Sequence, residues 1–292
     1  MRLAVHHCTR YRFSRPVTDI IQALRLTPQS CLSQTVLEWR IDVDCDARLR
    51  ESRDGYGNIV HMLYVNAPVT ELAITATGRL ITEQSAGVVQ GLPADLPPAV
   101  FLRATELTQP DAALRAFAAE AAKGEPKSLD LLHRINGALY EQIIFDTAST
   151  SAATPAAAAF EAKRGVCQDF AHIFVTAARL AGIPARYVSG HLFRRDGLAV
   201  QSASHAWSEA FVADLGWVAF DPANGICADD AYVRLAAGLD YGEAAPLVGA
   251  RRGGGDETMT VEVSVTEANR WSQSQRQRQS GGGSQSQSQS QD

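Results

Sequence analysis

A cysteine stands at the start of a predicted helix, directly after a glycine turn. Residues 165–172 read Gly-Val-Cys-Gln-Asp-Phe-Ala-His, and the apolar residues after Cys167 recur at helical spacing until Gly182-Ile183-Pro184 ends the helix. A thiol at a helix N-terminus lies beside unpaired backbone N–H groups and the positive end of the helix dipole, which favours the reactive thiolate. Cys167 is therefore the candidate nucleophile.

Two downstream residues complete a candidate nucleophilic triad. His205 begins a predicted strand, and Asp221 ends the next one. In such a triad the thiol attacks a carbonyl carbon, and the backbone N–H of Cys167 helps to hold the oxyanion. His205 shares the thiol proton and then protonates the leaving amine, while Asp221 holds the other imidazole nitrogen. The chain order Cys-His-Asp predicts acyl chemistry on an amide.

The spacing of the two strands decides whether His205 and Asp221 can meet. Side chains on a strand alternate between faces, so the odd-numbered residues of each strand share a face. A five-residue loop over residues 212–216 makes these faces coincide and sets Asp221 opposite Trp207. His205 is then a diagonal neighbour at roughly 7–8 Å, within reach of a hydrogen bond. A four-residue loop sends Asp221 to the other face, and a three-residue loop over residues 214–216 leaves His205 too far along.

Other polar residues near the motif compete for a role. His172 lies about 140° around the helix from Cys167, so we place it on the polar face or behind the site. His191 lies on a strand and ranks second to His205 as the base, because no acid is placed beside it as Asp221 is. Asp169 suits the helix dipole, and we expect it to point away from the thiol. Glu209 shares the face of His205, either in the substrate cleft or in a surface salt bridge.

The bulk composition is that of an ordinary soluble globular protein. The chain has 292 residues, 46% of them hydrophobic and 20% charged, which is enough to bury a core and to form two domains. A net charge of −5 with well-mixed signs gives no support for a nucleic-acid partner. No apolar run approaches the ~20 residues that span a bilayer, and the N-terminus lacks a secretory signal. With five scattered cysteines and no disulfide pattern, we expect a cytoplasmic protein with no membrane partner.

The chain divides into a β-rich part, a linker, a mixed core and a tail. The predicted fold class is α+β, with an antiparallel β-sandwich followed by a core of helices and strands. The boundaries are 1–84 for the β-rich domain, 85–105 for a Gly/Pro/Ala-rich linker, 106–270 for the core with its late strand over 258–266, and 271–292 for the tail. The Gln/Ser/Gly composition of the tail predicts disorder.

Four sequence blocks occur in an order that resembles the core of bacterial transglutaminase-like proteins. They read Gly-Val-Cys-Gln-Asp-Phe-Ala-His, Gly-Ile-Pro-Ala-Arg-Tyr-Val-Ser-Gly, His-Ala-Trp-Ser-Glu and Gly-Trp-Val-Ala-Phe-Asp-Pro-Ala-Asn-Gly. The first part of the chain, with Tyr-Arg-Phe at 11–13 and Asp-Gly-Tyr-Gly-Asn at 54–58, resembles the β-rich region that often precedes this core. The resemblance implies a papain-like fold in which a Cys-bearing helix packs on an antiparallel sheet. It also implies that Cys167, His205 and Asp221 are the catalytic residues.

The same resemblance implies acyl chemistry through a thioester. Hydrolysis is the favoured outcome, so we expect a cysteine peptidase or amidase whose partner is a peptide or protein amide. Two alternatives stand beside it: a transglutaminase, in which a lysine or polyamine replaces water, and a non-catalytic peptide-binding module. We predict no cofactor and no metal, because a calcium-site pattern is absent from the sequence and the His-His-Cys run at residues 6–8 points to opposite strand faces.

Overall fold

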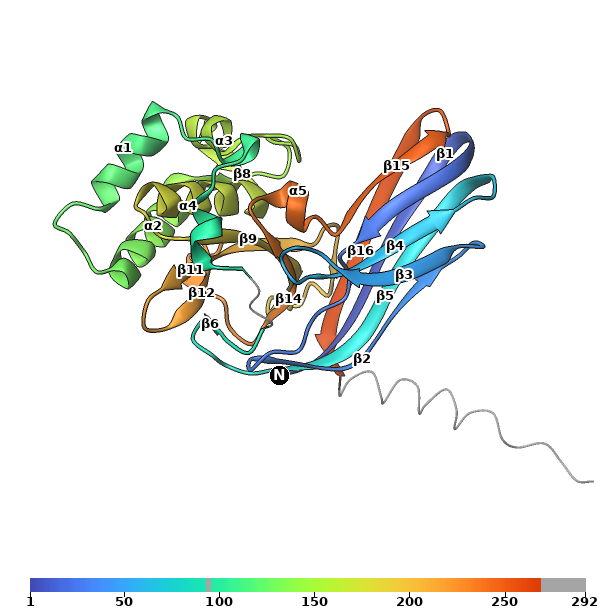
Figure 1. Ribbon diagram of the computed structural model, residues 1–292, viewed down its shortest axis with the longest axis horizontal. Coiled ribbons are helices and arrows are strands. Elements are labelled where there is room, and N and C mark those ends of the chain that lie inside the picture. Colours follow the sequence, from blue (N-terminus) through green and yellow to red (C-terminus); the bar gives the residue numbers. More distant parts are fainter. Residues whose placement is uncertain (93–95, 269–292) are drawn as a thin grey trace, which may run out of the picture.

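The computed structural model describes residues 1–92 and 96–268, which form a β-sandwich and a mixed core (Figure 1). The sandwich strands run to the upper right of the view, and the helices gather at the upper left. The strands of the sandwich are β1 (Arg2–Leu24), β2 (Gln34–Val43), β3 (Arg48–Arg53), β4 (Ile59–Val65), β5 (Val69–Thr82), β15 (Leu247–Gly253) and β16 (Glu257–Glu267).

The sandwich is organised around one long strand. β1 has 23 residues; its first half pairs with β5 and β16, and its second half pairs with β4 and β15. The pairing register shifts between Arg12 and Val17, where the strand passes from one layer to the other. Buried side chains from both layers, such as Ile20 of β1 and Ile74 of β5, fill the space between them. The predicted antiparallel sandwich is confirmed, with β1 shared by its two layers.

The late strand joins the sandwich rather than the core, to which the sequence assigned it. β16 pairs with β1 from Leu3↔Glu267 to Phe13↔Glu257. Its buried residues Val263 and Val265 pack with Leu3. Alternating apolar residues predict a half-buried strand but not its partner, so this assignment was wrong. The predicted tail over 271–292 lies outside the described residues.

The core packs helices on one face of an antiparallel sheet with the strand order β13-β12-β11-β9-β14. Its elements are β6 (Val88–Val89), η1 (Pro98–Leu102), η2 (Glu106–Thr108), α1 (Ala112–Ala121), α2 (Ser128–Gln142), β7 (Ile144–Phe145), α3 (Ala156–Ala162), β8 (Arg164–Gly165), α4 (Cys167–Leu180), β9 (Ala185–Leu192), β11 (His205–Val212), β12 (Gly216–Asp221), β13 (Ile226–Cys227), β14 (Tyr232–Gly238) and α5 (Tyr241–Ala244). Between β9 and β11, the short strand β10 (Val200–Gln201) leaves the core and pairs with β16 of the sandwich. In α4, Phe174 stacks on Phe220 of β12, and Ser208 of β11 donates a hydrogen bond to the Ala171 carbonyl. A Cys-bearing helix thus packs on an antiparallel sheet, as predicted.

The segment predicted as a linker contacts the core at two places. β6 pairs with β12, and the Ala219 N–H donates to the Gly87 carbonyl at 2.8 Å. Phe101 of η1 is buried and meets the Trp217 ring edge-on at 5.1 Å. Glycine, proline and alanine therefore mark irregular backbone here, not a free connection. Among the described residues, no helix has both the length and the apolar character needed to cross a membrane.

Two amide side chains of the sandwich bond to the outer edge of β14. Gln34 donates to the Arg234 carbonyl at 3.0 Å and accepts from the Arg234 N–H at 2.9 Å. Asn58 donates to the Ala237 carbonyl at 2.8 Å and accepts from the Ala237 N–H at 2.9 Å. Each amide takes the place of a neighbouring strand, because it offers one donor and one acceptor to the same residue. The sandwich therefore supplies hydrogen-bond partners to backbone groups of β14 that would otherwise be unpaired at this edge of the core sheet.

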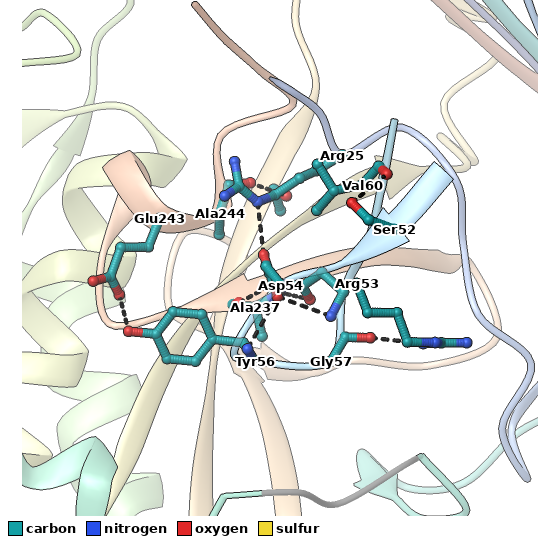
Figure 2. Close-up of polar contacts among 12 residues, drawn as sticks. Arg25, Ser52, Arg53, Asp54, Tyr56, Gly57, Val60, Ala237, Glu243 and Ala244 are labelled. Carbon is teal, nitrogen blue, oxygen red and sulfur yellow. Dashed lines mark hydrogen bonds and ion pairs between the residues drawn. The ribbon is translucent and has the colours of Figure 1, made fainter. Parts of the chain in front are cut away.

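The loop that carries Asn58 is held by the Asp54 carboxylate (Figure 2). Asp54 accepts hydrogen bonds from the backbone N–H groups of Tyr56 and Asn58, both at 3.0 Å, and from the Arg25 guanidinium at 3.0 Å. Tyr56 reaches the core directly, since its hydroxyl donates to Glu243 of α5 at 2.5 Å (Figure 2). The Asp-Gly-Tyr-Gly-Asn run is thus a contact between the sandwich and the core.

We expect Asn58→Ala to destabilise the protein strongly. Asn58 is buried, and its loss leaves the N–H and the carbonyl of Ala237 without partners. The free energy of unfolding, measured by urea denaturation, should fall by about 2 to 4 kcal/mol. The exposed Asn66 is the matched control, and Asn66→Ala should change the same quantity by less than about 0.5 kcal/mol. Equal effects of the two substitutions would show that Asn58 does not join the two parts.

Candidate active site

Cys167 is the first residue of α4, and a capping arrangement fixes the turn before it. The Asp169 carboxylate accepts from the Val166 N–H at 2.8 Å and from the Thr150 hydroxyl at 2.6 Å. A Cβ at Gly165 would lie 2.6 Å from this carboxylate, which explains why the turn needs glycine. Asp169 is committed to the turn rather than to the thiol, as the sequence predicts. Since the first N–H groups of a helix lack intrahelical partners, the Cys167 N–H is available to a ligand.

The strands β11 and β12 pair in the register that the sequence predicts. Phe211 pairs with Trp217 and Ser208 with Phe220, which sets Trp207 opposite Asp221. The ladder continues for one more pair, so the turn itself spans only residues 213–215. The His205 Nε2 atom lies 2.6 Å from the Asp221 Oδ2 atom. The diagonal contact between these residues is therefore present.

Asp221 is fully buried and surrounded by hydrogen-bond donors. Besides His205, its Oδ2 atom accepts from the Tyr232 hydroxyl and from the Asn224 side-chain amide, each at 2.7 Å. Its Oδ1 atom accepts from the backbone N–H groups of Ala223 at 3.0 Å and Asn224 at 3.3 Å. Burial raises the pKa of Asp221, but His205 and these donors outweigh it, so that the pKa is lowered overall. The group is therefore a carboxylate that can stabilise a charged imidazole.

His205 connects Asp221 to the thiol. Because Nε2 bonds to Asp221, the Nδ1 atom is the one left for Cys167. Burial lowers the pKa of His205, while the charges of Asp221 and Cys167 and hydrogen bonding to both raise it, with a net result of about 10. The raised pKa favours the charged imidazolium, the form that can donate a proton.

Cys167 and His205 open on one cleft of about 1280 Å³. Its walls come from both parts of the chain. Thr9 and Tyr11 of β1 and Met259 of β16 line it from the sandwich side. The sandwich therefore forms part of the surface that a molecule bound at Cys167 would touch.

Two regions of the chain match known families. Residues 3–80 match the bacterial transglutaminase-like N-terminal region, and residues 115–222 match the transglutaminase-like superfamily. The protein ML0607 of Mycobacterium leprae is 33% identical over 278 residues, which cover 91% of this chain and 98% of that protein. The chain belongs to the transglutaminase-like superfamily. Rv2569c of Mycobacterium tuberculosis is a further relative. It is 30% identical over 275 residues, which cover 85% of this chain and 87% of that protein.

The transglutaminase-like architecture is shared with a solved structure. A candidate cysteine protease from Cytophaga hutchinsonii has a TM-score of 0.75 to this chain and 20% sequence identity. The likeness covers 92% of this chain and 91% of that protein. The arrangement of sandwich and core is therefore a fold common to both proteins.

The other histidines of this transglutaminase-like chain do not reach Asp221. His172 is fully buried, and its Nε2 atom accepts from the Tyr241 N–H at 3.0 Å, which excludes the polar face and leaves the expected place behind the site. His191 is also fully buried, and its ring packs edge-on against His7 of β1 at 5.2 Å. Of the three histidines weighed as the base, His205 alone has a carboxylate partner among the described residues.

Glu209 lies neither in the cleft nor at the surface, contrary to both expectations. It is fully buried and accepts from the Arg186 guanidinium at 2.6 Å and from the Arg234 guanidinium at 2.8 Å. Burial raises the pKa of Glu209, but the two arginines outweigh it and lower the pKa to about 2. Strand alternation correctly placed Glu209 on the same face of β11 as His205. It could not show that other side chains cover this face at Glu209 and bury it. Glu209 thus forms structural ion pairs with two arginines of the core sheet.

Tyr232 and Asn224 are the site residues that sequence analysis did not identify. Asn224 follows Asp221 by three residues in a turn, a spacing at which side chains commonly cap one another. Tyr232 lies on β14, two strands away from β11, and no local signal connects it to Asp221. Both hold the Asp221 carboxylate, and the Tyr232 ring also packs against the His205 ring, with 5.9 Å between the centroids, so they are positioning residues.

We expect Tyr232→Phe to slow alkylation of Cys167. The substitution removes one donor from the Asp221 carboxylate, which weakens its hold on His205. The rate of iodoacetamide labelling near pH 7, measured by intact mass, should fall on the order of fivefold, and its pH profile should shift. Tyr64→Phe in the sandwich is the control and should leave the rate and the profile unchanged. An unchanged pH profile in a folded Tyr232→Phe protein would contradict the positioning role.

The buried neutral histidines predict a loss of stability in mild acid. Burial lowers the pKa of His7 and of His172 from 6.5 to about 4, and that of His191 well below its usual value. The unfolded chain binds protons that the folded chain excludes, so the free energy of unfolding should fall as pH drops from about 6.5 towards 4. Urea denaturation at several pH values measures this slope.

Substitution of single histidines tests which rings cause this acid dependence. His191→Leu should flatten the slope, whereas His133→Leu, at an exposed position, should not. A slope that is the same in wild type and His191→Leu would assign the acid sensitivity to other groups.

Proposed function

We propose that this transglutaminase-like chain is a cysteine-dependent hydrolase that cleaves amide bonds through a thioester on Cys167. The observation that carries this proposal is the 2.6 Å contact between His205 and the buried Asp221 carboxylate, beside a thiol at a helix N-terminus. Membership of the superfamily supports cysteine chemistry of this kind. The assignment of Cys167, His205 and Asp221 as a catalytic triad is part of the proposal.

The first half of the reaction forms the thioester. The Cys167 Sγ atom attacks the amide carbonyl carbon, and the oxygen takes up negative charge near the free N–H of Cys167. His205 gives a proton to the amide nitrogen, so that ammonia or an amine leaves as the C–N bond breaks. Asp221 keeps the imidazole oriented and stabilises its charged form.

The second half returns the enzyme to its starting state. Water attacks the thioester carbon and gives one proton to His205, and the C–S bond breaks to release the carboxylic acid product and the sulfur of Cys167 as its thiolate beside the protonated His205. The walls of the cleft are open to solvent, since Tyr140 and Met259 are each more than half exposed. Access of water to the thioester favours hydrolysis over transfer to an amine.

The test is an incubation of the purified chain with a library of peptides, with and without a primary amine. We expect new peptide termini or deamidated glutamine, with masses that show addition of water. Cys167→Ala should lose at least about a thousandfold in kcat/KM, and His205→Ala should lose nearly as much, because triad members act as a unit. Asp221→Asn should lower kcat with little change in peptide binding.

The other outcomes separate the alternatives. Products that carry the added amine in preference to water would identify a transglutaminase. Binding of peptides without any product, unchanged in Cys167→Ala, would identify a non-catalytic binding module. Products formed at the wild-type rate by Cys167→Ala would contradict the mechanism.

A further inference from the structure

We propose that the cleft at Cys167 binds an extended polypeptide segment whose side chains beside the reacting amide are uncharged and apolar. This inference deepens the proposed function and rests on it, because it concerns the substrate of the same site. Three properties of the cleft carry it: its exposed apolar walls, the pairing of its charges and its extent.

Large apolar side chains stand exposed around the cleft on both sides. Tyr140 of α2, Phe145 of β7 and Ile226 of β13 come from the core and are 56%, 54% and 44% exposed. Val200 of β10 and Met259 of β16 are 60% and 55% exposed and lie along the edge of the sandwich sheet. Exposed apolar groups gathered at one place mark a binding surface, because their contact with water is unfavourable until a ligand covers them.

The arginine and aspartate side chains that line the cleft are paired with one another or with close neighbours. Arg194 donates to Asp196 at 3.1 Å. Arg195 donates to Asp229 at 2.7 Å and to Asp230 at 3.0 Å. Within the described part of the chain, no lysine and no glutamate lines the cleft. A charged substrate side chain finds no unpaired opposite charge here, whereas an apolar one covers the exposed apolar walls, so the cleft favours neutral side chains.

The extent of the cleft fits a chain rather than a small amide. Its volume of about 1280 Å³ exceeds the roughly 300–1,000 Å³ of pockets for drug-sized ligands. It extends from Phe145 and Gln168 of the core to Thr9 and Tyr11 of the sandwich. Several residues of a peptide can occupy such a length, with the reacting amide at Cys167 and side chains against both walls.

Binding to the Cys167→Ala protein tests the proposal without any turnover. The probes are fluorescent peptides of equal length with leucine or valine on both sides of a central glutamine, and matched peptides with lysine or glutamate at those places. Fluorescence anisotropy measures their Kd. We expect the apolar peptide to bind at least about tenfold more tightly than either charged peptide.

Two neighbouring residues of β7 provide a matched pair of variants. Phe145 and Ile144 are both more than half exposed, but only Phe145 lines the cleft. Phe145→Asp should weaken binding of the apolar peptide at least tenfold and improve binding of the lysine peptide, whereas Ile144→Asp should change neither. Val200→Asp and Leu198→Asp form a second such pair at the sandwich edge, because Leu198 is exposed outside the cleft.

The outcomes distinguish this inference from the proposed function. Equal binding of apolar and charged peptides, no binding of any peptide, or equal effects of Phe145→Asp and Ile144→Asp would overturn the inference. Iodoacetamide labelling of each variant with Cys167 intact reports on the thiol by itself. A rapidly labelled thiol in a protein without peptide preference would therefore leave the proposed chemistry standing and reject only the substrate class.

Discussion

The buried carboxylate of Asp221 is the group on which the rest of the site depends. A charge taken out of water is costly unless hydrogen bonds and an opposite charge replace its hydration. His205, Tyr232, Asn224 and two backbone N–H groups supply that replacement. Because the carboxylate is satisfied in one arrangement, it holds the imidazole in one orientation. That orientation leaves Nδ1 of His205 to the thiol at the start of α4.

The same dependence extends from the core into the sandwich. Tyr232 reaches Asp221 from β14, an edge strand of the core sheet. Two residues further along, Arg234 of this strand is bonded on both its N–H and its carbonyl by Gln34 of the sandwich. Since Asn58 does the same at Ala237, the strand that supports the carboxylate is itself fixed by the first part of the chain. We infer that the sandwich stabilises the site as well as forming one wall of its cleft.

The sequence predicts the elements of the site better than their surroundings. The strand parity of His205 and Asp221 predicts the hairpin register, because a shift by one residue would have separated them. The helix start at Cys167 follows from its glycine turn and the spacing of apolar residues. In contrast, the burial of Glu209 and His172 depends on which other elements cover their faces. The partner of β16 and the role of Tyr232 depend on contacts between residues far apart in the chain, which local patterns do not encode.

The rate of iodoacetamide alkylation of Cys167 as a function of pH tests the central claim most directly. If His205, held by Asp221, pairs with a thiolate, wild type should label rapidly and singly well below pH 8. Cys167→Ala should then lose this rapid labelling below pH 8, while its four remaining cysteines react only as ordinary thiols at higher pH. His205→Ala should likewise label only as pH approaches about 8.5, the range of an ordinary thiol. A wild-type profile that coincides with that of His205→Ala would show that the histidine does not activate the cysteine, and would contradict the account.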